Sequence, residues 1–332
     1  MNNKNKKQLA LVNKLLLGNK AVIIVFLLAL FLTFASPVFL TSVNLLNVLR
    51  QVCVSTILAC GFAMILGNGD IDLSVGSVVG FTGICVGNML NRGMPIILAV
   101  LLTLCIGAAI GAVNATILNT FKLPAFIVTL ATQQIIRGAC YLITNMIPVT
   151  GVPESFCFIG QGYVAGIPFP VFIMAAAVII VWILINRTKF GRYLLAIGGN
   201  AEAARVCGIN VKRMKIFIFM ASGICSTVAG LVLTARSASA QPTGGLNMEM
   251  DAIAAVVVGG TSMSGGKVNV AGAFFGCLIV GLISNGLNLL GINTQWQTVA
   301  KGLLILFAVV LDSVSTTLFQ RMEQKRKLKE VA

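Results

Sequence analysis

The sequence contains no histidine and few charged residues. Only 10% of its 332 residues are Asp, Glu, Lys or Arg, and nine acidic residues face 24 basic ones. The lack of histidine excludes histidine-based metal sites, Ser-His-Asp triads and histidine proton relays. A soluble domain carries about 25% charged residues. A soluble fold of this composition would therefore have too little polar surface to cover its core.

The nine cysteines are scattered and never form a CxxC pair. Most lie in apolar runs, which indicates small buried side chains rather than disulfides or zinc ligands. Hydrophobic residues make up 58% of the chain. A membrane protein tolerates this composition because its outer surface meets lipid. The sequence therefore predicts an integral membrane protein.

Ten apolar segments are candidates for membrane helices, which need about 20 residues each. We expect them at residues 21–40, 47–67, 74–90, 94–118, 125–147, 169–186, 214–235, 250–263, 269–289 and 297–318. The first could pass for a signal peptide, but its apolar run continues through Leu40, so we interpret it as an uncleaved span. The predicted fold is an all-α polytopic membrane protein with about ten transmembrane helices.

The basic residues gather in three places: the N-terminal segment 1–20, the segment 187–215 and the tail 319–332. An even number of spans puts all three on one side of the membrane, and the opposite loops then carry only Arg92 and Arg236. Cytoplasmic loops are rich in Lys and Arg, so both termini are expected in the cytoplasm. Membrane orientation explains the net charge of +15, and we expect no nucleic-acid partner.

Two halves, residues 44–147 and 214–312 of a transmembrane domain at 21–318, show matching irregularities. The short Gly-rich spans expected at 74–90 and 250–263 lie beside GNGDIDLSVG (67–76) and VGGTSMSGGK (258–267). Paired short or broken helices indicate a substrate path through a repeat-built transporter. Packing of small residues between helices could produce the same pattern.

The stretch GGTSMSGGKVN invites comparison with a phosphate-binding loop. A Walker A loop reads GxxxxGK[ST], but here Thr261 occupies the first glycine position and Val268 follows the lysine. No strand–loop–helix context surrounds it. We therefore expect no ATP site and no bound cofactor in this chain. Energy for active transport would have to come from another subunit or from an ion gradient.

Polar residues within spans are costly and tend to be functional. Asp70 and Asp72 could line a substrate path, where a carboxylate accepts hydrogen bonds from sugar hydroxyls. Alternatively, Asp72 or Ser74 could cap the following helix. Polar stripes such as Thr129, Thr132 and Gln133 either join helices or line the path. Glu249 and Asp251 fit the start of a helix. The candidate path residues are Asn68, Asp70, Asp72, Ser74, Asn114, Thr132, Gln133, Thr261, Ser262, Asn285 and Asn288.

The basic loop contains a short helix-forming segment, residues 201–207. Asn200 suits its N-cap, Glu202 its first turn and Gly208 a left-handed end. An isolated helix of this length is unstable, since about 12–15 residues are needed in water. The segment must therefore pack on something, either on its own membrane domain or on a cytoplasmic partner.

The stretch GRYLLAIGGNAEAARVCGINV resembles the cytoplasmic coupling-helix loop of permease subunits from ribose- and galactoside-type ABC importers. DIDLSVGS, PAFIVTLATQQIIRG, DAIAAVVVGGTSMSGGK and ISNGLNLLGINTQWQTVAKGLLILFAVVLD resemble the same family in the same order, over residues 44–312. The similarity is greatest to ribose-type permeases. At Asn68 the family pattern has a second glycine, and this departure bears on substrate identity.

The resemblance implies a permease dimer in the bacterial cytoplasmic membrane, without a catalytic site of its own. Two ATPase subunits would bind ATP and Mg and receive the coupling helices, and an extracytoplasmic solute-binding protein would deliver a monosaccharide, ribose being the leading expectation. Glu202→Lys is expected to disrupt coupling and leave membrane insertion intact. The implied ATPase contacts are Gly199, Asn200, Glu202, Ala203, Ala204 and Gly208.

Two other functions are compatible with parts of the sequence. A secondary transporter driven by H⁺ or Na⁺ would use a carboxylate such as Asp70 as its coupling site, and its uptake would collapse with an ionophore. A membrane-embedded enzyme is the third possibility, and the lack of histidine and of any nucleophile–base pair argues against it.

Overall fold

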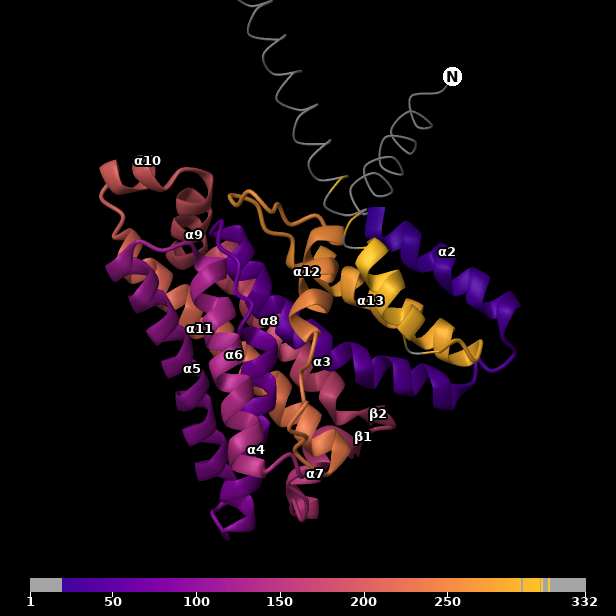
Figure 1. Ribbon diagram of the computed structural model, residues 1–332. Helices are drawn as coiled ribbons and strands as arrows, with labels where there is room; N and C mark the ends of the chain where they lie inside the picture. The colour runs from indigo at the N-terminus through magenta and orange to yellow at the C-terminus, as the bar shows by residue number, and fades with distance from the viewer. Residues whose placement is uncertain (1–19, 294, 305, 307–309, 311–332) are drawn as a thin grey trace, which may run out of the picture.

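The computed structural model describes residues 20–293, 295–304, 306 and 310. The labelled helices in this part of the chain are α2 (Lys20–Ala35), α3 (Ser42–Gly67), α4 (Val75–Asn91), α5 (Ile96–Phe121), α6 (Ala125–Thr144), α7 (Glu154–Gln161), α8 (Phe169–Arg187), α9 (Lys189–Gly199), α10 (Ala201–Val206), α11 (Val211–Ser237), α12 (Met248–Val258) and α13 (Val270–Leu289). Residues 295–304 are also helical. The strands β1 (Tyr163–Val164) and β2 (Ile167–Pro168) form one antiparallel hairpin. The described part of the chain is therefore mainly helical (Figure 1), which confirms the all-α prediction.

Six helices of the described chain are long and apolar enough to cross a membrane: α3, α5, α6, α8, α11 and α13. The apolar helical segments at 21–35 and 75–91 are shorter. α12 has 11 residues, which at about 1.5 Å per residue covers roughly half of a hydrocarbon core. The span expected at 250–263 is thus too short to cross alone. The span expected at 297–318 lies largely outside the described residues.

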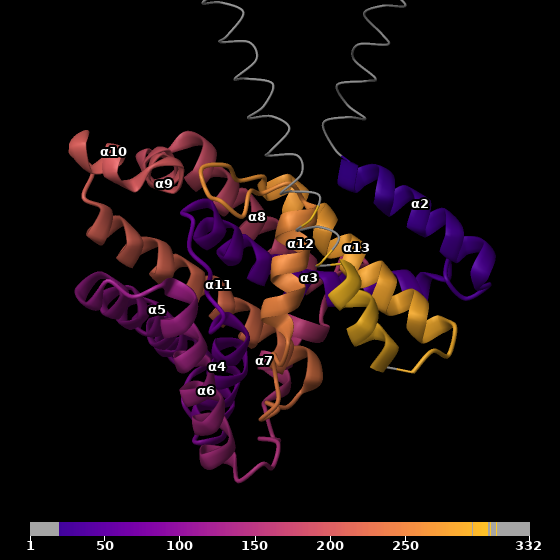
Figure 2. The ribbon, with the colours of Figure 1, turned by 45° about the horizontal axis from the view of Figure 1, so that its top comes forward.

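α11 lies in the middle of the bundle and packs against α3, α4 and α5 (Figures 1 and 2). The helices approach closely because glycines face backbone: Gly107 of α5 lies against Gly223 of α11, and Gly230 of α11 lies against the carbonyl of Val79. Small residues of this kind let membrane helices pack tightly where no hydrophobic effect drives them together. On the other side of the molecule, α2 packs against α13 (Figure 1).

The helices differ in how much of their surface faces outward. Within the most apolar 18-residue stretch of each helix, 78% is buried in α3, against 22% in α5 and in α8. The outward faces of the outer helices carry large apolar side chains such as Ile97, Leu101 and Val113. Such a surface is suited to contact with lipid. A chain with few charged residues can therefore expose these faces without polar side chains to cover them.

The two Gly-interrupted stretches are non-helical: residues 68–74 precede α4, and residues 259–269 follow α12, so the helix ends before residues 259–263 of the span expected at 250–263. Three elements were not predicted: α7, the β1–β2 hairpin and α9. In α9 the glycines 191, 198 and 199 weaken the helix signal. Its buried residues Gly191, Leu194 and Ile197 nevertheless recur at three-residue spacing.

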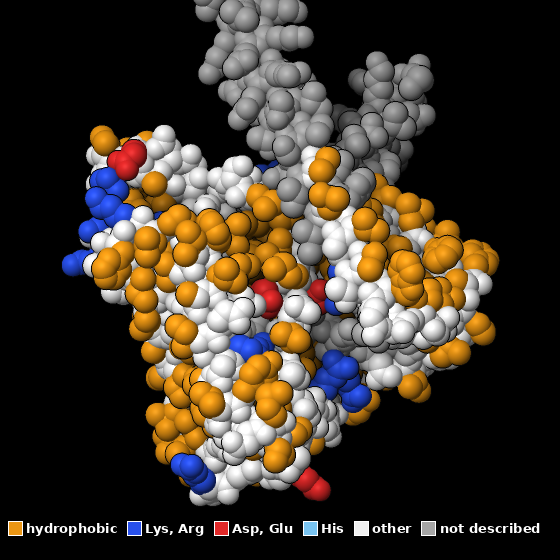
Figure 3. Space-filling model, viewed as in Figure 1, with side chains coloured by type: hydrophobic (Ala, Val, Ile, Leu, Met, Phe, Trp, Pro, Cys, Tyr) orange, Lys and Arg blue, Asp and Glu red, His pale blue; other side chains and the backbone are white. Residues whose placement is uncertain are grey.

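The two ends of the molecule differ in content. α9 and α10 lie at the same end as the start of α2, and α7 with the β1–β2 hairpin lies at the opposite end (Figure 1). Figure 3 shows basic side chains gathered at the corner that carries α10. The described part of the basic segment 187–215 is thus largely helical and stands at one end of the bundle.

Candidate functional site

Asp70 lies at one end of a series of neighbouring polar side chains inside the bundle. Its carboxylate is 2.8 Å from the Nζ of Lys215 on α11, and the Asn68 Nδ2 donates to it at 2.6 Å. The side chains of Lys215 and Asp70 are only 23% and 11% exposed. This partly buried ion pair ties the 68–74 segment to α11.

The next contacts join the same segment to α5 and α6. Asp72 accepts hydrogen bonds from the backbone N–H and the hydroxyl of Ser74, at 2.9 and 2.6 Å. Asn114 Nδ2 donates to Ser74 Oγ at 3.1 Å, and Thr132 Oγ1 donates to Asn114 Oδ1 at 2.7 Å. The structure therefore brings together four of the candidate path residues predicted from separate motifs.

These contacts refine the capping prediction for α4. Ser74 occupies the N-cap position, but its side chain makes no capping hydrogen bond. The hydroxyl instead donates to Asp72, which is 3% exposed. Capping by the Ser74 side chain is thus wrong, because its oxygen is already bonded to Asp72 and Asn114. Asp72, by contrast, does satisfy a backbone N–H directly before α4.

Gln133 connects the first half of the chain to the second. Its Nε2 donates to Glu249 Oε1 at 2.9 Å, and its backbone carbonyl accepts from Ser77 Oγ at 3.0 Å. Glu249 is 3% exposed and packs against Gly76 at the start of α4. Its Oε2 has no hydrogen-bond partner in the described part of the chain. The starts of the short helices α4 and α12 therefore meet beside α6.

Arg137 of α6 fixes the loop that leads into α12. Its NH1 donates to the carbonyls of Pro242 and Gly244 at 3.0 and 2.8 Å, and its NH2 donates to the carbonyl of Gly76 at 3.4 Å. The side chain is 7% exposed. A buried guanidinium with three backbone acceptors holds α4, α6 and the 238–247 loop in one arrangement.

A second ion pair lies nearby on α12. Lys301 Nζ is 2.8 Å from Asp251 Oδ2, and both side chains are less than one third exposed. Glu249 and Asp251 do lie in the first turn of α12, as predicted, but their side-chain partners are tertiary ones, Gln133 and Lys301. Figure 3 shows acidic and basic side chains near the middle of this otherwise largely apolar face.

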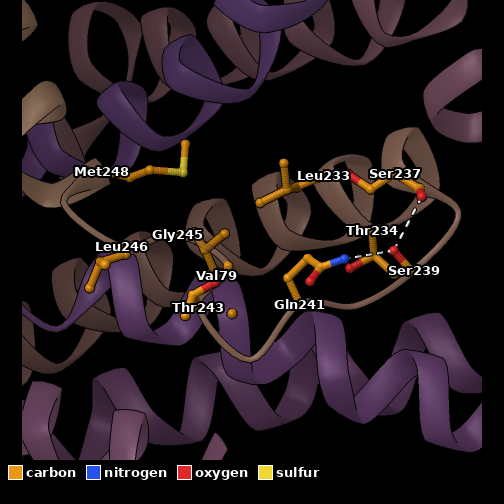
Figure 4. A pocket seen from close by; sticks show the side chains of 12 residues that line it. Val79, Leu233, Thr234, Ser237, Ser239, Gln241, Thr243, Gly245, Leu246 and Met248 are labelled. Atoms are coloured by element: carbon orange, nitrogen blue, oxygen red, sulfur yellow. Dashed lines mark hydrogen bonds between the residues drawn. The ribbon is translucent and has the colours of Figure 1, made fainter. Parts of the chain in front are cut away.

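A pocket of about 320 Å³ adjoins this polar series at the end of α11. Figure 4 shows hydroxyl and amide side chains at one end of it and apolar side chains at the other. Gly80 and Gly244, which line the pocket, also lie beside Arg137. Its polar lining residues are Thr234, Ser237, Ser239, Gln241 and Thr243.

Four predicted path residues lie outside this polar series. Asn285 pairs with Asn44 through two amide hydrogen bonds, and Asn288 accepts from Gln297 at 2.6 Å. Thr261 Oγ1 accepts from the Asn269 N–H, and Ser262 Oγ accepts from the Ser264 N–H. These side chains join helices or close the 259–269 loop.

The path residues predicted from the sequence do not include Arg137, Glu249 and Lys215. Arg137 and Glu249 were visible as polar residues in apolar segments, which is a usable signal. Lys215 was counted only as a cytoplasmic charge, although it pairs with Asp70 across 145 residues of sequence. In the described part of the chain, no group of three Cys, Asp or Glu side chains is placed to hold a metal ion.

The predicted features of the 201–207 segment are largely confirmed. Asn200 is the N-cap of α10 and its Oδ1 accepts from the Ala203 N–H at 2.9 Å. Gly208 has φ +84°, in the left-handed region. Ala204 is buried, whereas Val206 is 89% exposed. α10 therefore rests on the bundle through one small side chain and presents an apolar one outward.

Asp70→Asn is expected to lower the free energy of unfolding by about 3 kcal/mol, because it leaves Lys215 partly buried without its counter-charge. The measurement is thermal unfolding in detergent. Adding Lys215→Gln to Asp70→Asn removes the stranded charge and should restore much of the loss. A double variant as unstable as Asp70→Asn alone would show that the ion pair is not the cause.

A family model described as the permease component of the branched-chain amino acid transport system matches residues 44–309. A ribose import permease protein of Haemophilus influenzae is 41% identical over 314 residues, covering 93% of this chain and 97% of that protein. A ribose import permease protein of Bacillus subtilis is 43% identical, covering 86% of this chain and 90% of that protein. An L-arabinose transport system permease protein of Escherichia coli is 38% identical, covering 83% and 84%. No solved structure matches the chain.

Proposed function

Because this chain belongs to the permease family of the branched-chain amino acid transport systems, we propose that it carries a ribose-like monosaccharide into the cytoplasm as the membrane subunit of an ABC importer. The family supports the assignment of this chain as the permease subunit of the importer. The sugar is supported by relatives named for ribose and for L-arabinose, which share about 40% of their residues with this chain along most of its length. The secondary-transporter alternative has no such support.

A permease component of an ABC importer works with an ATPase and a solute-binding protein. We place ATP and Mg on the ATPase and no catalytic step on this chain. The observation that carries the ATPase contact is α10: a capped helix of six residues, largely exposed, with Val206 projecting outward. A helix this short needs a packing partner to be stable. The contact residues proposed are Gly199, Asn200, Glu202, Ala203, Ala204 and Gly208.

The remaining partners follow from the surface and the charge. We propose that the apolar outer faces of α5 and α8 contact lipid and that two copies of the chain form the permease. We also propose that the α10 end, where α2 begins, faces the cytoplasm, and that both termini are cytoplasmic. The basic segment at that end supports the orientation, since cytoplasmic loops are rich in Lys and Arg. α7 and the β1–β2 hairpin would then face the solute-binding protein.

We propose that the sugar passes along the polar series between the pocket and Asp70. Hydroxyl, amide and carboxylate groups suit sugar hydroxyls, and the apolar end of the pocket suits the carbon face of a sugar ring. The series lies where the short helices α4 and α12 of the two halves, 44–147 and 214–312, meet. Asn68, Asp70, Asp72, Ser74, Asn114, Thr132 and Gln133 belong to this proposed path; Thr261, Ser262, Asn285 and Asn288 would support it from outside.

The test is uptake by proteoliposomes that contain this chain and its ATPase, with ATP inside and the solute-binding protein and labelled ribose outside. We expect uptake to require ATP and the binding protein and to be unaffected by an ionophore. Uptake that persists without ATP and collapses with the ionophore would instead identify an ion-driven transporter. ATP-driven uptake of an amino acid and not of ribose would overturn the sugar.

A further inference from the structure

Backbone from three distant segments meets without intervening side chains at Gly67, Gly198, Gly265 and Gly266, which we call the glycine junction. The Gly266 N–H donates to the Gly67 carbonyl at 2.9 Å. A Cβ at Gly198 would collide with that same carbonyl and would lie 2.6 Å from the Gly266 nitrogen. A Cβ at Gly265 would lie 2.6 Å from the Gly198 carbonyl oxygen. Each contact therefore depends on the absence of a side chain.

The geometry of the 259–269 loop adds a second requirement for glycine. Gly265 and Gly266 have φ of +81° and +75°, in the left-handed region that disfavours other residues. This conformation turns the loop so that its backbone rests on α9. Leu194 and Ile197 of α9 are buried in the same cluster as Val268, which packs beside the junction.

The three segments lead to different parts of the proposed machinery. Gly198 lies two residues before Asn200, the cap of α10. Gly67 ends α3 and directly precedes the segment that carries Asp70 and Asp72. Gly265 and Gly266 lie in the loop after α12, the helix that carries Glu249. At the junction, α9, which leads into α10, thus directly contacts the residue that leads into the 68–74 segment and the 259–269 loop.

We propose that the glycine junction passes a displacement of α9 and α10 to the 68–74 segment and to α12, so that its glycines are positioning residues for transport. The inference rests on the proposed function. Closely packed backbone transmits a displacement because it has no rotamers with which to absorb it. A side chain inserted here would push α9 away from the 68–74 segment and the 259–269 loop, while leaving the surface of α10 unchanged.

The test compares Gly198→Ala with Gly138→Ala in the reconstituted complex. Both glycines are helical, Gly198 in α9 and Gly138 in α6, neither has positive φ, and a Cβ at Gly138 meets no described atom within 4 Å. We expect Gly138→Ala to behave as the unsubstituted chain. We expect Gly198→Ala to retain the ATPase subunit and hydrolyse ATP, with sugar taken up per ATP reduced about tenfold, within the usual range of coupling between sites.

The ratio of uptake to ATP hydrolysis distinguishes coupling from simple loss of protein. Equal ratios for the two variants would overturn the proposal. If Gly198→Ala loses the ATPase subunit, Gly67→Ala decides: its Cβ collides with the Val268 side chain, so adding Val268→Ala should raise the ratio again. No recovery in that double variant would also overturn the proposal. Absence of ATP-driven ribose uptake by the unsubstituted chain would count against the proposed function instead.

Discussion

Replacing residues 200–208 by a Gly/Ser linker is expected to abolish ATP-driven uptake and to release the ATPase subunit during purification. The segment has the structure of a docking element. Asn200 caps α10, Glu202 and Arg205 pair at 3.0 Å on its exposed side, and Val206 is 89% exposed. A flexible linker keeps the chain connected but removes this ordered surface, so the membrane domain should still insert.

The measurement is affinity purification of the tagged chain from membranes in mild detergent, followed by uptake assays. Co-purification of the ATPase with the linker variant at the normal level would contradict the docking role. A sharper pair is Glu202→Lys against Glu154→Lys. Both acids are exposed and lie in the first turn of a short helix, but Glu154 belongs to α7 at the opposite end of the molecule. Only Glu202→Lys should weaken co-purification of the ATPase.

Arg137→Met is expected to destabilise the protein by about 3 kcal/mol, since each buried carbonyl left without its donor costs roughly 1–3 kcal/mol. The carbonyls concerned belong to Gly76, Pro242 and Gly244. Their loss frees the loop between α11 and α12 and the start of α4, both of which adjoin the proposed path. Uptake should therefore fall to background, even in protein that still inserts.

Thermal unfolding in detergent measures the stability effect, with Arg92→Met as the matched control. Arg92 is exposed at the end of α4, so the same substitution there should change the melting temperature little. Arg137→Lys should lie between the two, because an ammonium group keeps the charge but lacks the planar fork that serves several acceptors. Equal melting temperatures for Arg137→Met and Arg92→Met would refute the role of Arg137 in holding this loop.

Several features could be predicted from the sequence because they depend on composition or on neighbouring residues. The scarcity of charge alone requires lipid as the surrounding medium. The cap at Asn200 and the left-handed Gly208 are local, since a side chain bonds a backbone group three residues away. The non-helical stretches at 68–74 and 259–269 follow from glycine and polar residues within them. The lack of a Walker A loop is likewise a property of adjacent residues.

The partners of the polar side chains were decided only by the tertiary structure. Asp70 is paired with Lys215, which lies 145 positions away in the sequence. Glu249 suited a helix start, yet its hydrogen-bond partner is Gln133 of α6. A polar residue in an apolar segment indicates that its side chain needs a partner, because an unpaired polar group is costly in a membrane. Which group supplies it depends on how the helices cross.

The glycines show the same division most clearly. Gly198 and Gly199 are adjacent and indistinguishable by type, and both lie in α9. Only the fold places Gly67 and Gly266 against the first and leaves the second exposed. The sequence by itself determined that this is a membrane protein with a short capped helix and two irregular segments, because those features arise from composition and short-range bonding. The tertiary structure decided which backbones touch, because close approach depends on residues far apart along the chain.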